Sequence, residues 1–229
     1  MTTRNTLDRE IRLVQDETLL LGNLVEQAVL NSIETLKSRD AAAAKAIIRN
    51  DAAINDKRFA IENRILLLFA THSPMARDLR LLAAELELIT ELERIGDYAK
   101  GIAKVAVELA NQETRIPIQE ISDMADLAVS MLHRALEAFI TEDLETARKI
   151  PIDDDQVDEL YKRIYHEIIQ SMVADPGSID RANQIVRVIH NLERTADRAT
   201  NICERIIFIA TGEMLESDST DDEVEMPED

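Results

Sequence analysis

The stretch from Glu91 to Lys100 reads ELERIGDYAK, and the stretch from Asn191 to Thr200 reads NLERTADRAT. Each contains a glutamate followed four residues later by an aspartate, within apolar residues spaced by three and four. This spacing places both carboxylates on one face of an amphipathic helix. Because the pattern recurs one hundred residues later, it predicts an internal duplication of a helical unit. The pairs are Glu93 with Asp97, and Glu193 with Asp197.

The composition favours a fold made of helices. The chain has 229 residues, 45% of them hydrophobic, which is enough to bury a sizeable core. Only 3% are aromatic and none is Trp, whereas strands are rich in aromatic and β-branched residues. Pro and polar breakers divide the chain into six predicted helices, near residues 5–37, 40–71, 74–111, 117–141, 143–173 and 176–213. Pro74 and Pro176 each follow a capping residue and are predicted to begin a helix.

The last three predicted helices repeat the first three at an offset that drifts from 103 to 100 residues. The sequence therefore predicts an all-α protein of two tandem, pseudo-symmetric three-helix bundles, over residues 1–112 and 113–214. Residues 215–229 are acidic, contain no basic residue and have little apolar content. We expect them to form a disordered acidic C-terminal tail.

The net charge and the hydropathy of the chain indicate which kind of partner the protein binds and in which compartment it works. A formal net charge of −19 argues against nucleic acid, which is bound through Lys and Arg, and favours multivalent cations. The longest apolar run, ILLLFA from Ile65 to Ala70, is too short to cross a bilayer, and the N-terminal residues do not resemble a signal peptide. We therefore expect a cytoplasmic protein without membrane insertion. The single Cys203 rules out an internal disulfide.

Further oxygen-bearing side chains occur on the helix before each Glu–Asp pair. Asp51 and Asn55 are spaced by four on the second predicted helix, and Asp154 and Asp158 on the fifth. In an antiparallel hairpin, these residues lie level with the Glu–Asp pair of the next helix, about 8–10 Å away between helix axes. Carboxylate and amide oxygens suit Mg, Mn or Fe ions. Each hairpin is therefore predicted to form a cation site, with room for more than one ion.

Two other interpretations of these acids remain open. The acids could be ordinary ion-paired residues, with Arg94, Arg194 or Lys100 as partners; but Glu93 follows Ile89 in an apolar stripe, where an unmatched charge costs several kcal/mol. The bundle could instead be a metal-storage or metal-dependent redox protein. None of the four histidines follows a glutamate by three residues, as di-iron bundles require, and no nucleophile–base or phosphate-loop motif occurs. We expect no catalytic residues.

The segment RDLRLLAAELELITELERIGDYAKGIAK from Arg77 to Lys104, the Asp51-x-x-x-Asn55 before it, and the repeat NLERTADRATNICE together resemble the PhoU family. The resemblance covers about residues 5–212. It implies a cytoplasmic homodimer that negatively regulates phosphate uptake and the phosphate-starvation response. Such a protein acts by contact, as an adaptor between the ATPase of the high-affinity phosphate ABC transporter and a phosphate-sensing histidine kinase. A paralogue that regulates another phosphate transporter is the alternative within the family.

The resemblance also implies metal ions, because family members with two such acidic motifs can carry multinuclear clusters. The candidate ions are Fe, Mn, Mg or Zn. The second site is favoured, since Asn55 leaves the first site one carboxylate short. Carried over by position, the ligands are Asp51, Asn55, Glu93 and Asp97 in the first site, and Asp154, Asp158, Glu193, Asp197 and Asn201 in the second.

Overall fold

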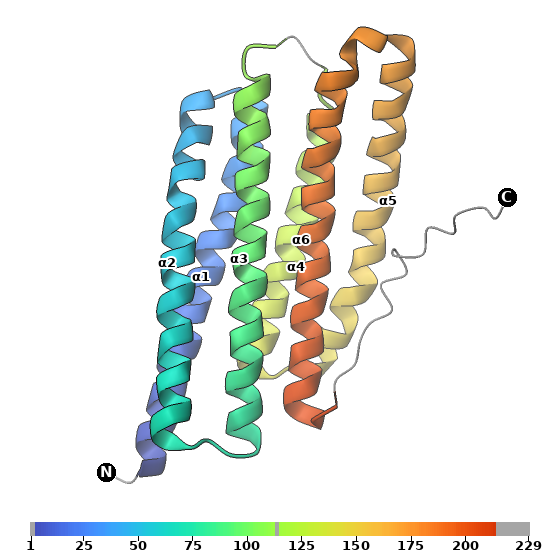
Figure 1. Ribbon diagram of the computed structural model, residues 1–229. Helices are drawn as coiled ribbons and strands as arrows, with labels where there is room; N and C mark the ends of the chain where they lie inside the picture. Colours follow the sequence, from blue (N-terminus) through green and yellow to red (C-terminus); the bar gives the residue numbers. More distant parts are fainter. Residues whose placement is uncertain (1–2, 113–114, 214–229) are drawn as a thin grey trace, which may run out of the picture.

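The computed structural model describes residues 3–112 and 115–213, and within them it contains helices and no strand. Figure 1 shows six long helices: α1 (Thr3–Ser38), α2 (Ala41–His72), α3 (Arg77–Leu109), α4 (Ile118–Thr141), α5 (Leu144–Ala174) and α6 (Ile179–Thr211). A short 3-10 helix, η1 (Pro176–Ser178), precedes α6. The all-α prediction is confirmed, whereas the predicted acidic tail lies outside the described residues. None of the described helices combines the length and the apolar character that crossing a bilayer requires.

The helix starts repeat between the two halves of the chain. Asp40 accepts hydrogen bonds from two backbone N–H groups at the start of α2, and Asp143 does the same at the start of α5. Asp175 likewise caps η1, which begins at the predicted Pro176, whereas α6 itself begins at Ile179. The predicted start at Pro74 is wrong. Ser73 precedes a proline, which disfavours right-handed helix, and it ends α2 in the left-handed conformation with α3 beginning at Arg77.

The two halves lie side by side with opposite polarity. Figure 1 shows α2, α3, α6 and α5 in one layer, with α1 and α4 behind them. Glu91 of α3 contacts Arg198 of α6, while Asn191 lies opposite Gly101, so α3 and α6 are antiparallel. The halves are therefore related by a pseudo-twofold axis that crosses the helices near residues 96 and 196.

One hydrophobic core extends through all six helices, so the two bundles share their interior. Two glycines permit close helix contacts within it. A side chain at Gly22 of α1 would clash with Leu136 of α4, where the two halves meet. A Cβ at Gly96 of α3 would lie 3.1 Å from Ile54 Cδ1 of α2. The second contact brings α2 close to α3 beside Asp97, one of the predicted ligands.

Candidate functional site

The first acidic site consists of Asp51 and Asn55 on α2 and of Glu93 and Asp97 on α3. The Lys100 ammonium group donates to Asp51 Oδ2 at 2.6 Å and to Asp97 Oδ1 at 3.4 Å. Asn55 Nδ2 lies 3.4 Å from the same Asp51 oxygen. The structure therefore brings Asp51, Asn55 and Asp97 together, as the hairpin geometry predicted.

Glu93 lies at the edge of the core rather than inside it. It is half-buried, while Ile89 before it is fully buried and Leu79 at the start of the same stripe is 46% exposed. Burial, followed by the neighbouring charge of Asp97, raises the pKa of Glu93, and Arg58 opposes that rise. The apolar stripe that contains Ile89 and Glu93 therefore does not bury Glu93 in the core, contrary to what its spacing predicted. The carboxylate occupies the boundary between α2, α3 and solvent.

Lys100 is the ion-pair partner of the first acidic site. Its side chain is 29% exposed and that of Asp51 is 8% exposed, so the pair is shielded from water. The hydrogen bond to Asp51 raises the pKa of Lys100, which keeps the ammonium charged at neutral pH. The two arginines considered as partners bind elsewhere: Arg94 pairs with Glu91 at 2.9 Å, and Arg194 stacks on the Tyr98 ring at 4.8 Å.

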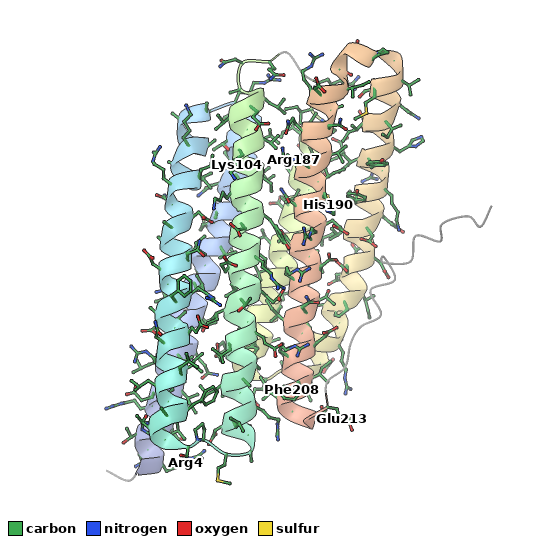
Figure 2. The ribbon with its side chains drawn as sticks, viewed as in Figure 1. Arg4, Lys104, Arg187, His190, Phe208 and Glu213 are labelled. Carbon is green, nitrogen blue, oxygen red and sulfur yellow. The ribbon has the colours of Figure 1, made fainter. Side chains whose placement is uncertain are left out.

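The second acidic site consists of Asp154 and Asp158 on α5 and of Glu193 and Asp197 on α6. All four are half-buried, and the two helices pack directly against each other. His190, on the face of α6 seen in Figure 2, has its Nδ1 atom 3.3 Å from Glu193 Oε2. Burial and the neighbouring Arg194 lower the pKa of His190, so at neutral pH its imidazole is mostly uncharged.

Asn201, the ninth predicted ligand, contacts the other half of the chain. Its Nδ2 atom donates to Glu91 Oε2 at 3.4 Å, and Arg198 binds the same oxygen at 3.2 Å. Asn201 thus contributes to the contact between α3 and α6, next to the second acidic site.

The two sites differ in the cations that their own helices supply. Lys100 and Arg58 flank the first site, whereas Thr200 and Tyr161 occupy the corresponding positions of the second half. The Thr200 hydroxyl is buried and has no hydrogen-bond partner among the described residues. The second site therefore lacks, at these two positions, the positive charges that the first possesses.

The donor chemistry of both sites fits a cation. The Lys100 ammonium already occupies a position between two carboxylates, which shows that the first site accepts positive charge. In residues 3–112 and 115–213, no three His, Cys, Asp or Glu side chains converge as a metal site requires. Binding an ion would therefore require the carboxylates to rotate toward it. Their oxygens suit Mg, Mn or Fe ions.

Sequence reasoning missed the most deeply buried carboxyl group among the described residues, that of Glu85. It is fully buried on α3, and Thr18 of α1 donates a hydrogen bond to its Oε2 atom at 2.9 Å. Its Oε1 atom has no hydrogen-bond partner among the described residues, and burial raises its pKa to about 7. The sequence could have predicted this burial, because Glu85 interrupts an apolar stripe whose residues Leu81, Leu88 and Leu92 are buried.

Known proteins are similar to this chain over nearly its full length. The sequence profile of the PhoU domain matches residues 18–106 and again residues 121–206. The chain is 33% identical to a phosphate-specific transport system accessory protein PhoU homologue of Clostridium acetobutylicum, covering 93% of this chain and 98% of the relative. A homologue of the same description from Streptococcus pneumoniae is 34% identical, covering 93% and 99%.

Solved structures agree with these relatives. The crystal structure of the phosphate transport system regulatory protein PhoU from Streptococcus pneumoniae superposes with a TM-score of 0.86 at 34% identity, covering 92% of this chain and 100% of the other. PhoU from Pseudomonas aeruginosa gives a TM-score of 0.85 at 30% identity, covering 90% and 99%. Sequence and fold thus agree over both halves, and the chain belongs to the PhoU family.

Proposed function

We propose that this protein is a cytoplasmic negative regulator of phosphate uptake and of the phosphate-starvation response. It acts as an adaptor between the ATPase of the phosphate ABC transporter and its sensor histidine kinase. The observation that carries the proposal is the match to phosphate-specific transport accessory proteins, which spans 93% of the chain and 98% of the Clostridium acetobutylicum relative. A match over both halves supports the function of the whole protein rather than that of one shared domain.

The proposed mechanism is contact between proteins, without a chemical reaction. The Cys203 thiol takes no chemical part, because burial raises its pKa to about 12 and so keeps it protonated and unreactive. The adaptor works as a homodimer.

Metal binding accompanies the adaptor role in this proposal. The ligands at the second acidic site are Asp154, Asp158, Glu193 and Asp197, with Asn201 one turn further along α6. The four half-buried carboxylates lie on two neighbouring helices, and a Fe, Mn, Mg or Zn ion held there would bind their oxygens and supply positive charge. An ion held by residues of both helices would stabilise the packing of α5 against α6.

A chromosomal deletion tests the regulatory role. Loss of the protein should switch on phosphate-starvation genes in phosphate-rich medium, and expression of the wild-type chain should restore repression. Tagged protein from phosphate-replete cells should recover a transporter ATPase and a histidine kinase. A clean deletion that leaves phosphate uptake and the starvation response unchanged would refute the proposal. Recovery of a different phosphate transporter would identify the protein as a paralogue with another partner.

A further inference from the structure

Lys100 occupies the place of a bound cation in the first acidic site. Its ammonium nitrogen lies 2.6 Å from Asp51 Oδ2 and 3.4 Å from Asp97 Oδ1, and so bridges the two helices that supply the acids. Asn55 joins the same Asp51 oxygen. An ammonium group at such distances forms charge-assisted hydrogen bonds, which satisfy carboxylate oxygens as a metal ion otherwise would.

The corresponding position in the second half lacks this charge. Thr200 stands where the first half has Lys100, at the same spacing from Glu193 and Asp197 as Lys100 has from Glu93 and Asp97. Its buried hydroxyl has no hydrogen-bond partner among the residues that the structure describes. One half therefore provides a cation at this helix position, and the other provides an additional oxygen.

We infer that Lys100 supplies the cation of the first acidic site from within the chain, so this site excludes metal ions. A divalent ion entering between Asp51 and Asp97 would have to displace the ammonium or lie within a few ångströms of it. Either event is unfavourable, because like charges at that distance repel and the displaced carboxylate contacts are lost. The inference rests on the proposed function only for the complementary statement that metal binds at the second site.

The test isolates the first site and then removes its ammonium group. The double substitution Glu193→Gln with Asp197→Asn disables the second site, and Lys100→Met is added to that background. Lys104→Met is the matched control, because Lys104 lies four residues further on α3, is exposed, and has no ion pair among the described residues (Figure 2). Both methionine variants lose one positive charge from the same helix, but only one loses the contact with Asp51.

Mn²⁺ binding is measured by equilibrium dialysis and by the shift in melting temperature. The background and the Lys104→Met chain should show little binding, whereas the Lys100→Met chain should bind Mn²⁺ at least about tenfold more tightly. Equal Mn²⁺ responses in the two methionine variants would overturn the inference. So would strong binding in the background with Lys100 intact.

The outcomes also separate this inference from the proposed metal site. If wild-type protein shows no Mn²⁺ binding but the Lys100→Met chain binds Mn²⁺, the inference stands and metal binding at the second site is refuted. If wild-type protein responds and Lys100→Met adds nothing to the background, the inference fails and the second site stands. Lys100→Gln, which keeps a donor for Asp51 without the charge, should also gain binding. If a variant folds only when Mn²⁺ is present, that result is scored as Mn²⁺ binding by the variant.

Discussion

The buried carboxyl group of Glu85 makes the stability of the fold depend on pH. Its pKa is 4.5 in its ordinary state and about 7 in the folded protein, because burial penalises the charged form. Between these two values the folded protein holds a proton that the unfolded chain has lost. Stability therefore falls as pH rises through this window, and the loss is complete above about pH 7.

The expected loss of folding stability follows from the two pKa values of Glu85. At 1.36 kcal/mol per pKa unit, the carboxyl group destabilises the fold by about 3 kcal/mol above pH 7 relative to acidic pH. Glu85→Gln preserves the side-chain volume and an oxygen that accepts from Thr18. Its NH₂ group replaces an oxygen that has no hydrogen-bond partner among the described residues, at a cost of about 1–3 kcal/mol that does not vary with pH.

Urea unfolding of both proteins, followed by circular dichroism from pH 4.5 to 8, isolates the pH-dependent term. The free energy of unfolding of Glu85→Gln should rise relative to wild type by about 3 kcal/mol across this range. The other titrating groups are common to both chains and cancel in the comparison. Parallel curves would refute the argument, since they would show that Glu85 titrates alike in the folded and unfolded states.

Two further predictions concern the metal site and the contact between the halves. Saturating Mn²⁺ should raise the melting temperature by about 5–10 °C, and a chelator should reverse this rise. The double variant Glu193→Gln with Asp197→Asn should lose most of the rise, and an unchanged Mn²⁺ response in that variant would contradict the assigned ligands. Gly22→Leu should lower stability by about 1–3 kcal/mol through its clash with Leu136, and adding Leu136→Ala should recover part of this in urea unfolding, whereas no recovery would place the strain elsewhere.

The helices and the hairpin register were predictable from the sequence because both depend on local patterns. Apolar spacing and capping residues determine where helices begin and end, and the position of each turn determines which residues lie level. Asp51 and Asp97 were therefore predicted to be neighbours, and they share the Lys100 ammonium. The Pro74 start was missed because Ser73 adopts a left-handed conformation that residue type alone does not reveal.

The charge balance of the sites could not be predicted in the same way. Sequence spacing shows which face a residue occupies, but not which of several cations reaches a given carboxylate. Lys100 reaches across to α2, whereas Arg94 bonds to Glu91 on its own helix. Burial was also misjudged, since the stripe ending at Glu93 runs along the edge of the core while Glu85 lies inside it. The depth of a helix face depends on all its neighbours, which a single helix does not specify.

The two halves, related by a pseudo-twofold axis, are arranged like the two subunits of a symmetric homodimer, but within one polypeptide. A three-helix chain bearing only one half would expose the faces that α3 and α1 bury here, and would cover them with a second copy of itself, making every contact twice. In this chain the repeated contacts have diverged. Glu91 binds Arg198 and Asn201, whereas the equivalent Asn191 lies against Gly101. Joining two copies covalently thus lets a single protein hold two different versions of one contact, which identical subunits cannot do.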